Sequence, residues 1–177
     1  MRRRRSLCLS FVIPLVVAAM TAGCAAPPAA PRREGANPGE QELKVVRIVD
    51  GDTIVVLISG RNERVRLIGI DTPESVKPNT PVECFALEAS ARMKTLLPPG
   101  SGVKLVRDVE LRDRYGRLLA YVYRASDNLF VNLSLVNDGY ASAYTYPPNV
   151  AHTAEFVGAA AEARDAGRGL WSRCPGR

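Results

Sequence analysis

Residues 50–74 read DGDTIVVLISGRNERVRLIGIDTPE, and the rest of the chain is best interpreted from this segment outward. It contains two short apolar runs rich in β-branched residues, 53–58 and 65–70, which are joined by Ser59-Gly60-Arg61-Asn62. Two such runs on either side of a short turn with a glycine predict a β-hairpin. Pro73 ends the second strand because proline cannot donate a hydrogen bond to a neighbouring strand.

Acidic residues lie at both ends of this hairpin. Asp50 and Asp52 stand at the start of the first strand, and Asp71 and Glu74 follow the second. Because a hairpin places the start of its first strand beside the end of its second, we expect Asp52 and Asp71 to meet near Arg66. Carboxylates bind hard cations, and a guanidinium binds phosphate. The pattern therefore predicts a site for a cation and a phosphate at one end of the sheet.

Further periodic segments predict a small α+β domain. We expect strands at 43–49, 102–107 and 118–124, helices at 84–97, 129–137 and 153–166, and an extended segment at 141–146. In the first of these helices apolar residues recur every three to four positions, and Pro98-Pro99-Gly100 ends it. Five strands with helices after the third and the fifth are compatible with a small Greek-key barrel of the OB type.

The composition is that of an ordinary globular chain. Hydrophobic residues make up 46% and charged residues 24% of the 177 residues, which is enough for one domain with a proper core. The formal net charge is +6, but four of the 24 basic residues are the arginines at positions 2–5, which leaves 20 against 18 acidic residues, or +2. Any attraction to phosphate must therefore be local.

The inventory of reactive residues argues against several classes of enzyme. His152 is the only histidine, so a nuclease that depends on a histidine pair is not expected, and zinc has little support without a C-x-x-C spacing. The sequence contains neither G-x-S-x-G nor a P-loop. The chemistry must therefore depend on carboxylates, arginines and tyrosines, with or without a metal.

Residues 1–23 have the pattern of a lipoprotein signal peptide. A cluster of arginines precedes an apolar run at 7–20 that is short for a membrane span. Thr21-Ala22-Gly23-Cys24 resembles a lipobox with Thr21 in place of the usual leucine, so Cys24 is the candidate lipidation site. A plain secretory signal and a retained anchor are the alternatives. We expect an exported protein, either an outward-facing lipoprotein of the cell membrane or a secreted one.

The rest of the chain divides into a tether and a domain. Residues 24–41 are rich in alanine, proline and glycine, which predicts a flexible tether that carries the lipid anchor. Residues 42–177 form the predicted domain, and we expect it to be a monomer.

The four cysteines fall into two groups. Cys8 leaves with the signal peptide and Cys24 takes the lipid, so Cys84 and Cys174 remain. An even pair in an exported protein predicts one disulfide, and two free buried thiols are the alternative. Such a crosslink typically stabilises a fold by ~2–4 kcal/mol.

Three separated blocks of the sequence resemble the staphylococcal nuclease family. They are DGDT at 50–53, VRLIGIDTPE at 65–74 and DRYGRLLAYVY at 113–123, in the order of the family. The resemblance covers roughly residues 43–173. It implies a five-stranded OB-type Greek-key barrel with three α-helices, an α+β fold. It also implies a Ca²⁺-dependent nuclease that acts on DNA and RNA, in which water attacks phosphorus, the 5′ oxygen leaves and the product ends in a 3′-phosphate.

The resemblance also assigns roles to individual residues. Its catalytic residues are a carboxylate that accepts a proton from, or orients, the attacking water and two arginines that stabilise the transition state: Glu74, Arg66 and Arg117. Its metal ligands are Asp52, Asp71 and, by the resemblance alone, the carbonyl of Thr72. Ligation by oxygen only suits Ca²⁺, with Mg²⁺ or Mn²⁺ as lesser options. Its substrate contacts are Arg114, Tyr115, Tyr144 and Tyr146, because a phosphate pairs with a cation and bases stack on aromatic rings.

Two functions other than catalysis are compatible with an exported barrel. The barrel could bind nucleic acid or another polyanion at the cell surface without cutting it, or it could be a purely structural envelope lipoprotein. The presence of all five family positions favours an enzyme, because a binding module would have no need to keep that set: Asp52, Arg66, Asp71, Glu74 and Arg117.

Overall fold

The computed structural model describes residues 43–76, 79–174 and 176. The predicted signal peptide, tether and lipidation site at Cys24 lie outside the described residues and stay predictions. Within the described part of the chain, no helix has both the length and the apolar character that crossing a membrane requires.

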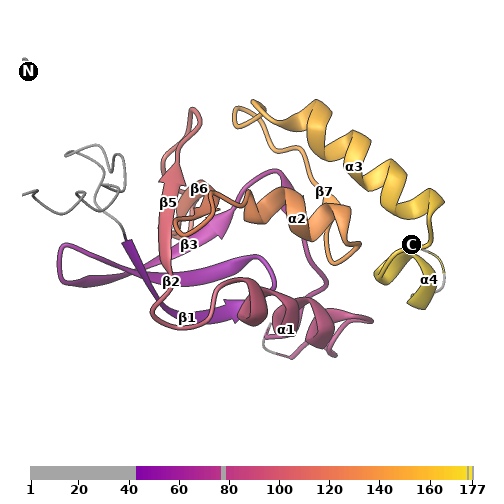
Figure 1. Ribbon diagram of the computed structural model, residues 1–177, viewed down its shortest axis with the longest axis horizontal. Coiled ribbons are helices and arrows are strands. Elements are labelled where there is room, and N and C mark those ends of the chain that lie inside the picture. Colours follow the sequence, from indigo (N-terminus) through magenta and orange to yellow (C-terminus); the bar gives the residue numbers. More distant parts are fainter. Residues whose placement is uncertain (1–42, 77–78, 175, 177) are drawn as a thin grey trace, which may run out of the picture. The chain divides into compact units, whose positions relative to one another are not determined.

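Five strands close into a barrel, in the order β1-β2-β3-β6-β5 (Figure 1). These strands are β1 Leu43–Asp50, β2 Thr53–Ile58, β3 Arg61–Leu67, β5 Gly102–Val106 and β6 Leu118–Arg124. Neighbouring strands are antiparallel except β3 and β6, which run parallel. The pairing of β1 with β5 closes the barrel. The predicted five-stranded barrel is confirmed.

Side chains along β3 point alternately into the barrel core and toward its outer face, where the predicted site residue Arg66 lies. Val65 and Leu67 are fully buried among the apolar side chains of the barrel. Because successive side chains of a strand point to opposite faces, Arg64 and Arg66 lie on the outer face. Arg66 pairs with Thr53 of β2 and with Leu119 of β6, so it stands where three strands run side by side.

In the described part of the chain, three helices and a short fourth one accompany the barrel. They are α1 Ala86–Leu96, α2 Val131–Asn137, α3 Thr153–Asp165 and α4 Leu170–Arg173. Helix α1 packs on β1, α2 on β6, and α3 on α2 (Figure 1). Helix α4 was not predicted, because four residues carry no periodic signal.

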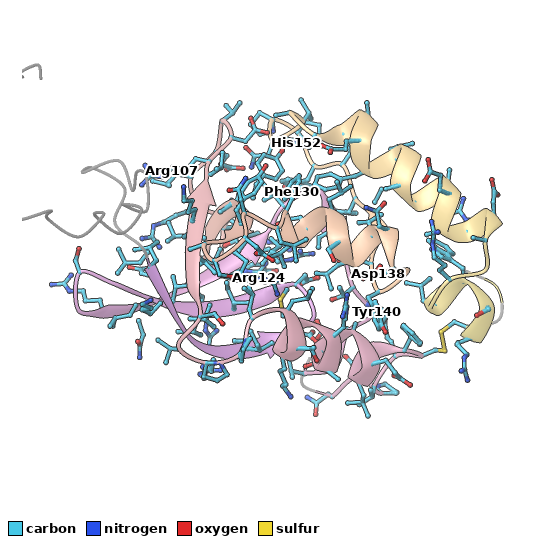
Figure 2. All side chains as sticks on the ribbon, viewed as in Figure 1. Arg107, Arg124, Phe130, Asp138, Tyr140 and His152 are labelled. Atoms are coloured by element: carbon cyan, nitrogen blue, oxygen red, sulfur yellow. A yellow bond between two sulfur atoms is a disulfide. The ribbon has the colours of Figure 1, made fainter. Side chains whose placement is uncertain are left out.

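Aromatic rings fill the space between α2, α3 and the barrel. The ring of His152 lies edge-on to that of Tyr121, with centroids 4.5 Å apart. It also lies edge-on to that of Phe130, with centroids 5.0 Å apart; His152 and Phe130 are labelled in Figure 2. Its Nδ1 lies 2.8 Å from the carboxylate of Glu155. The single histidine of the chain therefore contributes to packing at the start of α3.

The second hairpin strand differs from its prediction at both ends. Ser59 and Gly60 both have positive φ and form a two-residue turn, so β3 begins at Arg61. At its other end β3 stops at Leu67, and Gly69, with φ of 80°, bends the chain.

The bend at Gly69 has a tertiary cause. The ring of Phe156 in α3 occupies the place where a β-carbon of residue 69 would be, so only glycine fits. After the bend, β4 Ile70–Asp71 pairs with β7 Ser142–Ala143 in a separate small sheet. The bend brings Asp71 beside Arg66.

Candidate active site

The guanidinium of Arg66 lies between two aspartates. Its Nη2 is 2.9 Å from Oδ1 of Asp71 and 3.1 Å from Oδ2 of Asp52. Its Nη1 donates to the carbonyl oxygens of Leu67 and Ile70 at 2.6 and 3.0 Å. These four acceptors fix the orientation of the Arg66 guanidinium, which is always positively charged.

Asp52 is buried and receives hydrogen bonds on both oxygens. Oδ2 accepts the backbone N–H and the hydroxyl of Thr72 at 3.1 and 3.0 Å, and Oδ1 accepts the hydroxyl of Thr53 at 3.0 Å. Gly51 permits this close approach, because a β-carbon there would lie 2.7 Å from Oγ1 of Thr72. The DGDT turn and the IDTPE segment are therefore held together by Asp52.

The two carboxylates can hold a hard cation. Asp52 Oδ2 and Asp71 Oδ1 converge on one nitrogen of Arg66, so both point into the same small space. Oxygen ligands of this kind fit Ca²⁺, whose remaining coordination positions accept water and phosphate oxygen. Among the described residues no group of three or more His, Cys, Asp or Glu side chains could hold a metal ion. Such a site would therefore depend on two carboxylates and on oxygens from outside these residue types.

Glu74 lies beside the buried carboxylate of Asp50. Its Oε1 accepts the backbone N–H of Val76 at 2.9 Å. Asp50 is buried, and its Oδ1 accepts the Ser75 hydroxyl at 2.6 Å and the Gly51 N–H at 2.8 Å. Burial raises the pKa of Glu74, the hydrogen bond to Asp50 and the charges of Asp50 and Asp52 raise this pKa further, and the Val76 N–H opposes them. A carboxylate with a raised pKa is better suited to accept a proton from water.

Arg117 is held by Asp113, which precedes it by four residues. Its Nε donates to Asp113 Oδ2 at 2.6 Å, and its backbone N–H donates to Oδ1 at 2.9 Å. Its guanidinium also lies 5.5 Å from the ring centroid of Tyr115. Asp113 was missed as a site residue. The signal for it was the first position of the DRYGR turn, where an aspartate accepts backbone N–H groups, as it does from Tyr115 at 2.9 Å.

A cleft of about 480 Å³ joins the two arginines. Seven of the predicted site residues line it: Arg66, Asp71, Arg114, Tyr115, Arg117, Tyr144 and Tyr146. Asp52, Thr72 and Glu74 do not line it, but Asp52 contacts Arg66 and Thr72 contacts Asp52. Glu110 and Asn149 also line the cleft and were not predicted; the Glu110 N–H donates to Asn149 Oδ1 at 2.8 Å.

The tyrosines form an exposed aromatic rim. Tyr144 and Tyr146 stack with ring centroids 6.3 Å apart and planes at 12°. Tyr115 is 69% exposed, and its hydroxyl accepts a hydrogen bond from Arg114 Nη2 at 2.6 Å. Exposed rings beside fixed guanidinium groups offer stacking surfaces and phosphate contacts together.

Comparison with known proteins agrees with this arrangement. The model of the family described as staphylococcal nuclease homologue matches residues 64–173. The chain belongs to the staphylococcal nuclease family.

Its similarity to individual members of the family extends over most of the chain. It is 45% identical over 135 residues to the thermonuclease of Staphylococcus intermedius, which covers 76% of this chain and 78% of that protein. It is 41% identical over 136 residues to the thermonuclease of Staphylococcus hyicus, covering 77% and 79%. It is 39% identical over 128 residues to the endonuclease YncB of Bacillus subtilis (strain 168), covering 72% and 60%.

This staphylococcal nuclease homologue also carries the predicted disulfide. Cys84 and Cys174 are bonded across 90 positions of sequence, with Cα atoms 5.8 Å apart. The bond connects the segment before α1 with the end of α4. The alternative of two free thiols is therefore wrong for this pair.

Proposed function

We propose that the cleft between Arg66 and Arg117 is the active site of a Ca²⁺-dependent nuclease that cleaves both DNA and RNA. As a member of the staphylococcal nuclease family, the chain is a nuclease, a hydrolase of phosphodiester bonds. The observation that carries the assignment is that Arg66, Asp71 and Arg117 line one cleft while Asp52 contacts Arg66 from the barrel.

In this proposal the two arginines stabilise the transition state. Attack on a phosphodiester places additional negative charge on the phosphoryl oxygens and on the leaving oxygen. Arg66 and Arg117 are always protonated, and carboxylates and carbonyls fix their orientation before the substrate arrives. Preorganised cations of this kind stabilise the transition state more than the ground state.

Glu74 acts on the attacking water. It accepts a proton from that water or orients it as the water attacks phosphorus, and the 5′ oxygen leaves, so that the product ends in a 3′-phosphate. The Val76 N–H and the neighbouring Asp50 hold its carboxylate. Its raised pKa makes it a better proton acceptor than an ordinary surface glutamate.

Asp52 and Asp71, with Thr72 beside them, would hold the cation. When bound, Ca²⁺ supplies positive charge next to the phosphate. Arg66 contacts both aspartates, and its positive charge offsets the repulsion between the two converging carboxylates.

The aromatic rim would bind the bases of the substrate. Tyr115, Tyr144 and Tyr146 offer faces on which bases stack with little sequence preference, and Arg114 is placed to contact a phosphate. None of these contacts requires a 2′-hydroxyl or excludes one. This supports activity on both DNA and RNA.

Digestion of single-stranded DNA and RNA by the full chain tests the proposal. We expect cleavage with Ca²⁺, none with the chelator EGTA, and strong loss of rate in Glu74→Gln and in Arg117→Ala. The DNA products should become primers for a DNA polymerase only after a phosphatase removes the 3′-phosphate. Full activity in EGTA would reject the cation, and products that prime without phosphatase would reject the direction of cleavage.

We also propose that the chain is exported, lipid-anchored through Cys24 and monomeric. The N-terminal sequence pattern supports export, and so does the Cys84–Cys174 disulfide, because disulfides persist in oxidising compartments. Labelled palmitate should be incorporated into the native chain and not into Cys24→Ser. Equal labelling of both, or a dimer in light scattering, would contradict this part.

A further inference from the structure

We propose that Glu83 is a positioning residue for Glu74, and that the Cys84–Cys174 disulfide keeps Glu83 in the place where it acts. This inference rests on the proposed role of Glu74 toward the attacking water. Neither Glu83 nor either cysteine lines the cleft. Glu83 acts on catalysis through its two hydrogen bonds to Glu74.

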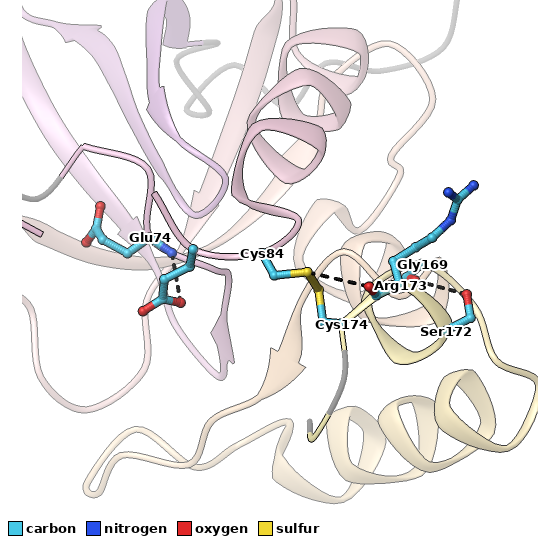
Figure 3. The surroundings of a disulfide bond; sticks show 7 residues. Glu74, Cys84, Gly169, Ser172, Arg173 and Cys174 are labelled. Atoms are coloured by element: carbon cyan, nitrogen blue, oxygen red, sulfur yellow. Dashed lines mark hydrogen bonds between the residues drawn. A yellow bond between two sulfur atoms is a disulfide. The ribbon is translucent and has the colours of Figure 1, made fainter. Parts of the chain in front are cut away.

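Glu74 and Glu83 are joined by two hydrogen bonds that run in opposite directions. The backbone N–H of Glu83 donates to the carbonyl oxygen of Glu74 at 3.0 Å. The backbone N–H of Glu74 donates to Oε2 of Glu83 at 3.2 Å, the bond drawn at Glu74 in Figure 3. The pair fixes the main chain of Glu74, and the direction in which its side chain starts depends on that main chain.

The disulfide ties this pair to the C-terminal end of the domain. Cys84 follows Glu83 directly and is bonded to Cys174 at the end of α4 (Figure 3). Helix α4 is itself fixed, because Leu170 is fully buried and its N–H donates to the Gly139 carbonyl at 2.8 Å. The position of Glu83 is therefore coupled to a well-packed element far along the sequence.

The residue after Cys84 shows that the segment is held under constraint. Phe85 has φ of 71°, in the left-handed region that is unfavourable for a bulky aromatic residue. Its ring packs against Tyr140 with centroids 5.3 Å apart. Strained backbone of this kind persists only where the surroundings hold it. Without the disulfide the chain around Phe85 can relax, and Glu83 then moves away from Glu74.

Substitution of Glu83 in the full chain tests the contact. On single-stranded DNA with saturating Ca²⁺, we expect Glu83→Ala to lower kcat roughly tenfold while KM stays within about twofold, because substrate contacts are intact. Glu83→Gln should retain most of the rate, since its amide oxygen accepts the same bond. Glu162→Ala, on the exposed face of α3, makes the same change in charge and should match the native rate. A native kcat in Glu83→Ala, or equal loss in Glu83→Gln, would overturn the inference.

Reduction of the disulfide tests the proposed role of Cys84–Cys174 in holding Glu83 in place. Dithiothreitol converts the bond to two thiols, and we expect kcat to fall by about the same factor as in Glu83→Ala. Reduction of Glu83→Ala should add little further loss, because both changes act through one contact. If the loss of kcat in reduced Glu83→Ala equalled the product of the two separate losses, the disulfide and Glu83 would act independently and the proposed coupling between them would be rejected. Glu83→Ala with its disulfide intact keeps the test valid if the reduced chain unfolds.

Amide hydrogen exchange of Glu74, followed by NMR, gives a readout that does not depend on cleavage. Exchange at Glu74 should be at least about tenfold faster in Glu83→Ala and in the reduced chain, with β2 amides unchanged. Unchanged exchange would overturn the contact. If Glu74→Gln cleaved at the native rate, the proposed function of Glu74 would fail while exchange still reported the contact. If Glu74→Gln were inactive and Glu83→Ala fully active, only the positioning role would fail.

Discussion

Asp113 binds Arg117 twice, through the side chain at 2.6 Å and through the backbone N–H at 2.9 Å. The carboxylate thus fixes both where the arginine begins and where its guanidinium points. Asp113 lines the same cleft as Arg66, so the β5–β6 connection and the β2–β3 hairpin each supply one oriented arginine to one space.

Loss of Asp113 should reduce catalysis without removing the arginine. We expect Asp113→Ala to lower kcat/KM on the order of tenfold, because Arg117 is no longer preorganised. Asp113→Asn keeps acceptor oxygen and should lose less. Kinetics on single-stranded DNA measure both, with Asp165→Asn on α3 as the control. A kcat/KM in Asp113→Ala equal to the native value would show that catalysis does not require Asp113 to orient Arg117.

Asp52 and Asp71 should differ in their effect on stability although both contact Arg66. The Asp52 side chain is 9% exposed and the Asp71 side chain 49%. Asp52→Ala leaves the buried N–H and hydroxyl of Thr72 without their acceptor and removes one of the two carboxylates that contact Arg66, and we expect a loss of about 2–3 kcal/mol in the free energy of unfolding. Asp71→Ala should cost less than about 1 kcal/mol. Urea denaturation in the presence of EGTA measures the free energy of unfolding of both variants. Equal losses in Asp52→Ala and Asp71→Ala would contradict the argument that the buried aspartate contributes more to stability.

Activity should fall on the acid side at a pH above that of an ordinary glutamate. Glu74 works as a carboxylate, so protonation stops it as pH decreases through its pKa. Burial and the neighbouring Asp50 and Asp52 raise this pKa above 4.5. Asp50→Asn removes one of those charges, lowers the pKa of Glu74 and should move the acid limb of kcat/KM to lower pH. If kcat/KM of Asp50→Asn, measured at saturating Ca²⁺, fell at the same acidic pH as that of the native chain, Glu74 would be excluded as the titrating group.

The stacked tyrosines should matter for binding more than for turnover. Stacking contributes about 1–3 kcal/mol per base, so Tyr144→Leu should raise KM roughly tenfold with little change in kcat. Tyr144→Phe keeps the ring and should stay near the native KM. Steady-state kinetics on oligonucleotides decide this. A fall in kcat alone would place Tyr144 among the groups that act in the chemical step.

Gly69 should tolerate no side chain. Its φ of 80° and the Phe156 ring beside it mean that Gly69→Ala must move α3 or straighten the bend. We expect a loss of more than about 1 kcal/mol in stability. Activity measured below the lowered melting temperature should fall as well, because the bend places Asp71. Gly60→Ala, in an open turn where nothing lies within 4 Å of a β-carbon, isolates the cost of positive φ.

The sequence determined the barrel strands because their signal is local. Apolar runs rich in β-branched residues on either side of a short turn at Ser59-Gly60 predict a hairpin, and its pairing places the start of β2 beside the end of β3. The count and chemistry of the cysteines likewise predicted the one disulfide that the described residues contain. The resemblance in three short blocks then indicated which arginines and carboxylates to expect in the site.

The way in which those groups are held depends on contacts between distant parts of the chain. The break in the strand after Leu67 depends on a ring of α3 that follows it by almost ninety residues, so no local pattern could reveal it. The same applies to Glu83, whose carboxylate has no distinctive sequence signal and accepts the backbone N–H of Glu74, nine residues earlier, only in the folded chain. Local propensity fixes strands and turns, whereas the orientation of a charged side chain is set by neighbours that folding brings from elsewhere in the chain.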